Sequence, residues 1–256
     1  MATTRISFFS PIRITTLILL LAFSAISYAA GNTTKDSFSK AKKMLEKSVY
    51  FDHRETIYCA ASFDSKKQIT APNGFHTSKY VKRAKKLEWE HVVPAENFGR
   101  TFKEWPEGSP QCSNNKGKSF KDRRCAEKVN VEYRHMQADM FNLYPAIGAV
   151  KALRSNYNFT MLPEEASDFG SCKMKIDNRK AEPPVEARGR IARTYLYMDE
   201  TYSRYSMSKS QKQLMNAWDK MYPVNEWECK RAKKITSLQG GDNNVVKLRC
   251  TDKGLW

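Results

Sequence analysis

The sequence predicts a mixed α+β fold, built as one domain over residues 31–256. Three observations support this prediction. Apolar residues recur at helical spacing in several separate segments, a segment rich in strand-forming residues interrupts them, and no internal repeat or linker divides the chain. With 41% hydrophobic and 12% aromatic residues, a chain of this length can bury a sizeable core, which excludes a disordered protein.

Residues 1–30 have the composition of an export signal. Arg5 and Arg13 give a positively charged start, residues 17–23 form an apolar run, and residues 27–30 offer small residues for cleavage. The apolar run is short for an uncleaved anchor, and no later stretch approaches the ~18 consecutive apolar residues of a membrane-spanning helix. We therefore expect a signal peptide that is removed, a periplasmic or secreted mature chain, and no stable insertion in the membrane.

Export places the six cysteines in an oxidising compartment, where an even number favours disulfides. No two of them have the Cys-x-x-Cys spacing that zinc sites use. Three disulfides, rather than a metal cluster, are therefore expected, although six cysteines allow ~15 pairings that spacing alone does not resolve. Two local pairs would each close a short, basic loop and leave one long-range pair: Cys112–Cys125, Cys229–Cys250 and Cys59–Cys172.

The first half of the exported chain alternates between helix, strand and loop signals. Residues 35–50 place apolar side chains at helical spacing, so a helix is predicted there. A strand-rich segment follows near 55–93, broken by the turn sequence Pro-Asn-Gly at 72–74. Residues 99–126 are polar and rich in Pro, Gly and Asn, which predicts a long loop closed by a disulfide.

Helical signals dominate the second half. Apolar residues recur at helical spacing over 129–140 and again over 147–153. Glu-Pro-Pro at 182–184 breaks the chain before a helix with an aromatic-rich stripe over 191–205, which we interpret as core. Ser208, with a glutamine three residues later, forms a capping box that starts a further helix, and this helix ends before the next proline.

The chain carries 44 Lys+Arg against 27 Asp+Glu, a formal charge of +17, and the first thirty residues contribute only two arginines to it. Such an excess attracts nucleic acid, an anionic membrane surface or an acidic polysaccharide, although a merely basic, solvated surface would also account for it. Rows of cations suit phosphate contacts, because each neutralised phosphate releases condensed counterions. Three clusters stand out: Lys79, Lys82, Arg83, Lys85 and Lys86; Arg188, Arg190 and Arg193; and Lys230, Arg231, Lys233 and Lys234.

The segment 87–95 reads Leu-Glu-Trp-Glu-His-Val-Val-Pro-Ala and contains the clearest candidate site. His91 has an imidazole, which suits a general base near neutral pH, and Glu90 offers the hard oxygen ligands that Mg²⁺ or Ca²⁺ prefers. Adjacent side chains of a regular strand point to opposite faces, so the two share one site only at a twist or at the strand end. Taken alone, a Glu-His pair in a strand is more often half-buried sheet.

This segment resembles the signature of the bacterial endonuclease I family, exported nucleases with a ββα-metal active site. The similarity extends in one order over roughly residues 35–250, far more than a lone motif gives. Further similar blocks are Met136–Met140, Asn142–Pro145, Arg154–Phe159, Ala187–Tyr195 and Trp227–Cys229. The resemblance implies a disulfide-stapled ββα-metal core with additional helices, acting as a non-specific endonuclease on DNA, often RNA too, with 5′-phosphate products.

Carried over position by position, the resemblance implies roles for single residues. His91 would deprotonate the attacking water, Glu90 would hold a divalent cation, usually Mg²⁺, and Arg123 stands where the family has a phosphate-contacting arginine. Arg124 lies beside it and is a second candidate for this position. We expect a monomer that grips the phosphate backbone through basic side chains: Lys82, Arg83, Lys85, Lys86, Arg154, Arg188 and Arg190.

One position departs from the family pattern. Lys151 stands in place of an asparagine that is the second protein ligand of the cation, and a protonated lysine has no lone pair and repels a dication. Gln137 also stands where a glutamate is common. Three interpretations follow: the cation binds through Glu90, water and phosphate; the Lys151 ammonium takes the cation's role; or the protein binds nucleic acid without cutting it. Retention of His91 and Glu90 favours cleavage.

The remaining candidate ligands have simpler explanations. Asn142 precedes Leu-Tyr-Pro and is interpreted as a turn or cap residue rather than as a substitute ligand. His53, His76 and His135 have no partner at a ligand spacing, so we expect structural or surface roles for them and no zinc site.

Overall fold

The computed structural model describes residues 1–2 and 31–256. The expected signal peptide falls almost wholly on residues 3–30 and therefore lies outside the described residues. In the part of the chain that is described, no helix has the length and apolar character needed to cross a membrane. The described residues form ten α-helices and three small sheets, so the predicted mixed α+β fold class is confirmed.

The two strands nearest the candidate site form an antiparallel pair. Strand β3 (Leu87–His91) pairs with β4 (Leu143–Ile147), and His91 lies opposite Leu143 at one end of the ladder. All five residues of β4 are buried. The sequence did not predict β4, because Pro145 in its centre argues against a strand with partners on both sides. A two-stranded ladder tolerates it, since the proline carbonyl still accepts the backbone N–H of Ile57 (2.9 Å) on the other side.

Helix α6 (Gly148–Arg154) follows β4 without a connecting loop and packs against both strands. Gly148 permits this close approach. A Cβ at this position would lie 2.7 Å from the carbonyl oxygen of Arg83 and 2.8 Å from Oε1 of Glu88. Any larger residue would therefore push the start of α6 away from β3. Two antiparallel strands and one helix thus lie together, with the candidate residues on them.

The segments before β3 are short. They are α1 (Phe38–Met44), a π-helical turn (Leu45–Val49), β1 (Ser62–Phe63), β2 (Ile69–Thr70) and α2 (Val81–Ala84). The helix predicted over 35–50 is confirmed, but the strand-rich segment predicted near 55–93 is only partly correct. Lysine is the commonest residue of 64–86, and this stretch has too few apolar residues to bury longer strands, so it forms mostly loops instead.

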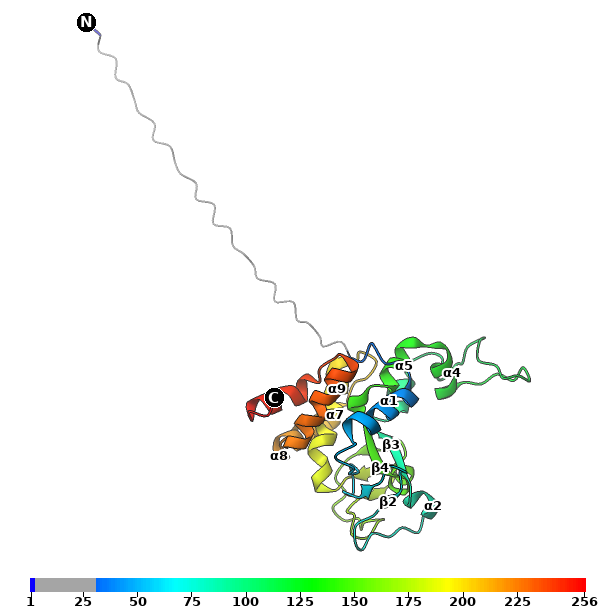
Figure 1. Cartoon of the computed structure of the whole chain (residues 1–256). Coiled ribbons are helices and arrows are strands. Elements are labelled where there is room, and N and C mark those ends of the chain that lie inside the picture. Colours follow the sequence, from blue (N-terminus) through cyan, green and yellow to red (C-terminus); the bar gives the residue numbers. More distant parts are fainter. Residues whose placement is uncertain (3–30) are drawn as a thin grey trace.

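A long loop separates β3 from the next major helices. After α3 (Ala95–Gly99) the chain runs through residues 100–121 before entering α4 (Asp122–Val129) and α5 (Val131–Gln137). Figure 1 shows this loop extending away from the body beside α4. The predicted loop is therefore confirmed, although α4 begins inside its expected bounds. A short 3₁₀ turn (Met140–Asn142) then leads into β4.

The C-terminal third is mainly helical. A three-stranded sheet of order β5-β7-β6 precedes the helices. Its strands and the helices that follow are β5 (Asn158–Phe159), β6 (Lys175–Asp177), β7 (Lys180–Glu182), α7 (Val185–Thr201), α8 (Lys209–Met221), α9 (Glu226–Gln239) and α10 (Asn244–Asp252). Figure 1 shows α7, α8 and α9 grouped on one side of the molecule. The predicted helix start at Ser208 is confirmed, because its hydroxyl accepts the backbone N–H of Gln211. Only this half of the predicted capping box is seen, since the Gln211 side-chain amide donates to the carbonyl of Phe159 (3.3 Å).

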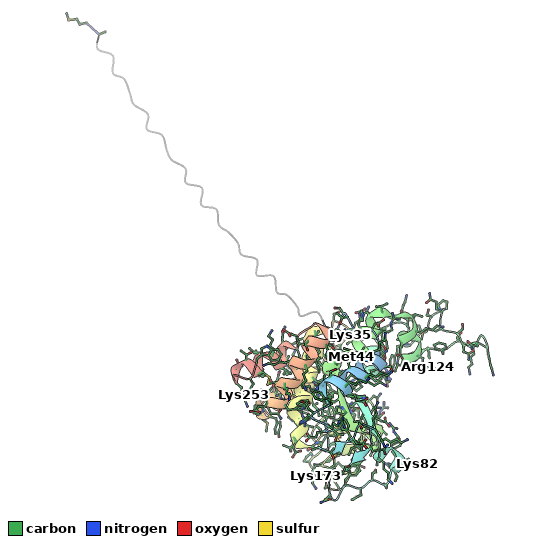
Figure 2. The ribbon with its side chains drawn as sticks, viewed as in Figure 1. Lys35, Met44, Lys82, Arg124, Lys173 and Lys253 are labelled. Carbon is green, nitrogen blue, oxygen red and sulfur yellow. A yellow bond between two sulfur atoms is a disulfide. The ribbon has the colours of Figure 1, made fainter. Side chains whose placement is uncertain are left out.

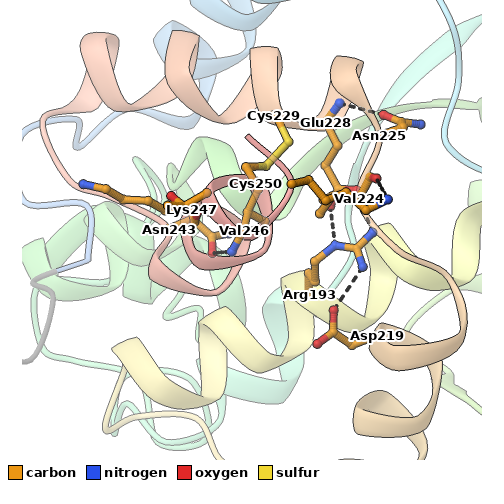
Figure 3. Close-up of a disulfide and its surroundings, with 12 residues drawn as sticks. Arg193, Asp219, Val224, Asn225, Glu228, Cys229, Asn243, Val246, Lys247 and Cys250 are labelled. Carbon is orange, nitrogen blue, oxygen red and sulfur yellow. Dashed lines mark hydrogen bonds and ion pairs between the residues drawn. A yellow bond between two sulfur atoms is a disulfide. The ribbon is translucent and has the colours of Figure 1, made fainter. Parts of the chain in front are cut away.

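A buried ion cluster holds these helices together. Arg193 of α7 donates to both carboxylate oxygens of Glu228 on α9 (2.7 and 2.6 Å) and to Asp219 on α8 (3.0 Å). The disulfide Cys229–Cys250 lies beside this cluster and joins α9 to α10 (Figure 3). Part of the second basic cluster of the sequence is therefore core rather than surface.

The six cysteines pair as Cys59–Cys172, Cys112–Cys125 and Cys229–Cys250, the same three pairs that the sequence favoured. The first joins segments 113 residues apart, and the second closes the protruding loop against α4. Because such links restrict the unfolded chain, the long-range bridge constrains it most.

Candidate active site

A cavity of about 750 Å³ lies where α1, β3, α4 and α6 come together. His91, Glu90, Arg123 and Lys151 all line it, so candidate residues from three elements, β3, α4 and α6, share one space. The two neighbours on β3 reach the same cavity because His91 is the last residue of the strand, where the strict alternation of faces ends. Glu90 and His91 therefore share one site at the end of the strand, where two adjacent side chains can do so.

His91 is held in the form that accepts a proton. Its Nε2 donates to the backbone oxygen of Gln137 at 2.8 Å, which leaves Nδ1 as the acceptor of the neutral ring. Burial lowers the pKa of His91 to about 3, and the positive charges of Arg123 and Lys151 act in the same direction. The imidazole is therefore neutral at pH 7. A phosphate entering the cavity would offset part of this lowering, because it brings negative charge.

Glu90 is buried beside the cavity, and the guanidinium of Arg154 balances its negative charge. Its Oε1 accepts from the Tyr58 hydroxyl (2.7 Å) and from Nη1 of Arg154 (2.8 Å). Arg154 also donates to the backbone oxygens of His91 (3.0 Å) and Val92 (2.7 Å), so it ties the end of β3 to α6. The predicted contact of Arg154 with nucleic acid is wrong, because the whole side chain is buried in this network.

Arg123 of α4 also lines the cavity. Its guanidinium donates to Oε1 of Gln137 (3.2 and 3.3 Å) and lies 5.0 Å from the ring centroid of Phe38. Gln137 therefore contacts both candidate catalytic residues, since its carbonyl holds His91. Arg124, the second candidate from the sequence, is exposed and pairs with Asp122 (3.8 Å) instead. The structure places Arg123, and not Arg124, in the cavity.

Lys151 and Arg83 share one carboxylate on the cavity wall. Arg83 donates to both oxygens of Glu88 at 2.7 Å, and Nζ of Lys151 lies 3.3 Å from Oε2 of the same residue. Burial opposes ionisation of Glu88, but the two cations outweigh it and lower its pKa. Arg83 was predicted to contact nucleic acid. It lines the cavity, and its guanidinium forms an ion pair with Glu88 there.

The exposed lysines around α2 remain available to a ligand. Lys82, Lys85 and Lys86 are all exposed, and Lys82 projects from the surface at α2 (Figure 2). They lie next to Arg83 and Leu87 in the chain, two residues that line the cavity. Such a row of cations suits contacts to successive phosphates.

The predicted contact of Arg188 with nucleic acid is wrong. Its side chain is buried, donates to Oε1 of Glu182 at 2.6 Å and lies 5.5 Å from the ring of Trp218. Arg190 is half-buried on α7, where Nη2 donates to the carbonyl of Glu186 (3.4 Å). Neither arginine is among the residues that line the cavity.

The residues present do not fit a bound divalent cation. Glu90 is a carboxylate already balanced by Arg154, and Lys151 adds positive charge to the same cavity. Within the described residues, no three His, Cys, Asp or Glu side chains gather as a metal-ligating group. Asn142 is no substitute, because its amide is taken up by the backbone of Val93 through bonds of 2.7 and 2.9 Å. A second protein ligand for Mg²⁺ is therefore missing from the described part of the chain.

Two residues of α1 complete the cavity and were not predicted. The ring of Phe38 lies 4.8 Å from that of His91, and Nζ of Lys42 lies 4.2 Å from the Phe38 centroid. The Phe38 ring thus contacts the imidazole and also two cations, Lys42 and Arg123. The sequence offered only its place in an amphipathic stripe, which is a signal for burial and not for a site. His53, His76 and His135 do not line the cavity.

Comparison with known proteins identifies the family of the chain. The family model of Endonuclease I matches residues 24–249. An extracellular deoxyribonuclease of Aeromonas hydrophila is 35% identical over 238 residues, which cover 90% of this chain and 98% of the relative. A periplasmic deoxyribonuclease of the same species is 37% identical, over 84% of this chain and 86% of the relative. Endonuclease-1 of Buchnera aphidicola subsp. Acyrthosiphon pisum is 34% identical, over 86% and 84%. The chain therefore belongs to the Endonuclease I family.

Proposed function

We propose that residues 31–256 form one exported nuclease domain that cleaves phosphodiester bonds within DNA, with RNA as a second substrate class. Family membership over most of the chain supports this activity, and the names of the extracellular and periplasmic deoxyribonucleases support a periplasmic or secreted location. The domain acts as a monomer after removal of the signal peptide at residues 1–30. Size-exclusion chromatography and N-terminal sequencing of the exported protein test these two points.

One observation carries the proposal. A neutral imidazole with Nε2 bonded to a carbonyl stands in a cavity lined by several cations. His91 takes a proton from the attacking water at Nδ1, and the water oxygen bonds to phosphorus. Arg123 stabilises the negative charge that grows on the phosphate oxygens. The bond to the 3′-oxygen breaks, which leaves a 5′-phosphate on one product.

Nucleases of this family generally use divalent cations. Mg²⁺ held by Glu90 is the sequence-based expectation, and where a cation is bound it supplies positive charge to the phosphate. The residues that line the cavity do not fit such an ion, because Arg154 balances Glu90 and Lys151 adds a positive charge.

Substrate binding uses the exposed lysines beside the cavity, with Lys82, Lys85 and Lys86 contacting phosphates. Contacts to phosphate and sugar carry no base information, so cleavage is non-specific in sequence. The exposed phosphate-binding row lies on α2 and just after it, while the reacting groups lie deeper, on β3 and α4. A nucleic-acid strand therefore lies across the margin of the cavity and presents one phosphate to His91.

The test is degradation of supercoiled plasmid by purified, disulfide-bonded protein. His91→Ala should lower the cleavage rate by at least about 100-fold, the lower range for loss of a general base. His76→Ala is the matched control, because His76 is exposed and does not line the cavity. Equal rates for wild type and His91→Ala would remove His91 from the reaction.

The presence of Lys151 in the cavity favours one second candidate function, a secreted protein that binds nucleic acid without cutting it. In that case the wild type would retard DNA in a mobility-shift assay and leave the plasmid intact, with Mg²⁺ and with chelator alike. Cleavage by the wild type under either condition excludes this candidate.

A further inference from the structure

The ammonium group of Lys151 has one ionic partner, and that partner is shared. Its Nζ lies 3.3 Å from Oε2 of Glu88, and both side chains are 29% exposed. Arg83 binds the same carboxylate through two bonds of 2.7 Å. One negative charge therefore faces two positive charges, and a net positive charge remains on this wall of the cavity.

The remaining charges of the cavity do not cancel this excess. Glu90, the acid closest to His91 in the chain, has its charge balanced by the buried guanidinium of Arg154. Two further acids line the cavity, and each has an arginine partner of its own: Glu96 pairs with Arg100 and Asp122 with Arg124. Lys42 and Arg123 approach the Phe38 ring from α1 and α4, and both line the same cavity. The space beside the imidazole is thus built to receive an anion and to repel a cation.

We infer that Lys151 is a catalytic residue of this chain, and that its ammonium group, positioned by Glu88, supplies the positive charge at the scissile phosphate so that cleavage needs no divalent cation. The inference rests on the proposed nuclease function and names the group that performs the cation's task. A lysine is suited to this role, because it is a compact point charge with three donors that can reach phosphate oxygens.

The step balances without any metal. His91 accepts a proton from water at Nδ1, and the electron pair of the resulting hydroxide forms the bond to phosphorus. Lys151 stays protonated and, with Arg123, stabilises the charge on the non-bridging oxygens. The electron pair of the breaking bond goes to the 3′-oxygen, which takes a proton from solvent. His91 then returns its proton to solvent, so that one water and one phosphodiester give a 3′-hydroxyl and a 5′-phosphate.

The experiment measures plasmid cleavage by wild type and Lys151 variants, after removal of metals, in chelator and in millimolar Mg²⁺. The wild type should cleave at rates within about threefold of each other in the two conditions. Lys151→Gln should lose about 100-fold in chelator, the range for removal of one group that stabilises the transition state. Lys151→Arg keeps the charge and should retain cleavage in chelator within about tenfold. Lys173→Asn is the matched control, because Lys173 is an exposed lysine that does not line the cavity (Figure 2).

Lys151→Asn supplies a readout other than activity. It removes the positive charge and adds an amide oxygen, which is a ligand that Mg²⁺ and Mn²⁺ accept. Mn²⁺ binding, followed by electron paramagnetic resonance, should be absent from the cavity of the wild type and present at one site in Lys151→Asn. Cleavage by Lys151→Asn should then depend on added divalent cation. Circular dichroism and thermal unfolding establish that each variant is folded. If the uncharged variants unfold, the inference is tested by Lys151→Arg alone, which should still cleave in chelator.

The outcomes separate this inference from the proposed function. Wild-type cleavage that stops in chelator and returns with Mg²⁺ overturns the inference and leaves the nuclease function intact. No wild-type cleavage in either condition, with cleavage by Lys151→Asn in Mg²⁺, overturns both for the natural chain. Cleavage in chelator that persists in His91→Ala indicates a contaminating nuclease and also counts against the inference. Cleavage in chelator that is lost in Lys151→Gln and kept in Lys151→Arg supports it.

Discussion

Replacing Arg154 by methionine should destabilise the fold far more than it affects contact with DNA. The change keeps a long apolar side chain but removes the donors to Oε1 of Glu90 and to the carbonyls of His91 and Val92, at 2.8, 3.0 and 2.7 Å. Glu90 would keep only the Tyr58 hydroxyl. Both members of the ion pair are almost fully buried, so water does not replace the missing donors.

The expected loss follows from these contacts. Removing one partner of a buried ion pair costs about 3–5 kcal/mol, because the other charge remains unpaired. Each of the two carbonyls left without a donor adds to this by about 1–3 kcal/mol where no relaxation compensates. Even the lower figure is a large fraction of the 5–15 kcal/mol that usually separates folded from unfolded protein. For a chain of this size we expect the Tm to fall by roughly 6–20 °C.

Urea unfolding followed by tryptophan fluorescence measures this loss. Arg124→Met is the matched control: Arg124 is exposed, so its variant should change the free energy of unfolding by less than about 0.5 kcal/mol. The double variant Glu90→Met/Arg154→Met should recover part of the loss, because no buried charge is then left unpaired. If Arg154→Met lowers the free energy of unfolding by less than about 1 kcal/mol, the assigned network is refuted. If it lowers DNA affinity without lowering stability, Arg154 contacts DNA after all.

Three further predictions concern acid, salt and reductant. The unfolded imidazole of His91 binds a proton near pH 6.5 and the folded one only near pH 3, so the unfolded state binds more protons in this window. Acidification should therefore destabilise the wild type more than His91→Gln, and parallel curves of unfolding free energy against pH would contradict this. Changing Lys82, Lys85 and Lys86 to glutamine should reduce the slope of log K against log salt for duplex DNA by up to about 2.7, with unchanged Tm. An unaltered slope would mean that the DNA binds at another surface of the protein. Reducing the three disulfides should lower the free energy of unfolding by about 2–4 kcal/mol for each bridge and stop plasmid cleavage, whereas equal cleavage with dithiothreitol would show that they are dispensable.

Strand β4 is an element of the fold that local sequence patterns did not predict. Asn142 was interpreted as a turn or cap residue, as asparagine often is, and no strand was predicted for the residues that follow it. The tertiary structure pairs this segment with β3, more than fifty residues earlier in the chain, and buries all five residues of β4. Cross-strand pairing and burial outweigh local preference when a strand lies in a two-stranded ladder.

Local sequence patterns also failed to separate the buried basic residues from the exposed ones. Lys82, Arg154 and Arg188 were assigned one role because they carry one charge, yet only Lys82 of the three is exposed. The arginines are buried because their guanidinium groups meet carboxylates and carbonyls from distant segments. No local pattern reports such partners, since the planar guanidinium suits both a buried carboxylate and an exposed phosphate.

Residue types and their short-range order determined several properties on their own: the α+β class, the expectation of three disulfides, the motif blocks that resemble the Endonuclease I family, and a histidine beside a glutamate as the candidate centre. These properties are encoded in residue type and short-range order, which the unfolded chain already possesses. Only the tertiary structure decided that Phe38 packs on the imidazole, that Arg123 rather than Arg124 enters the cavity, and that Lys151 stands there bound to Glu88. Such contacts join segments that are far apart in the chain, and burial and charge act across them only after the chain has folded.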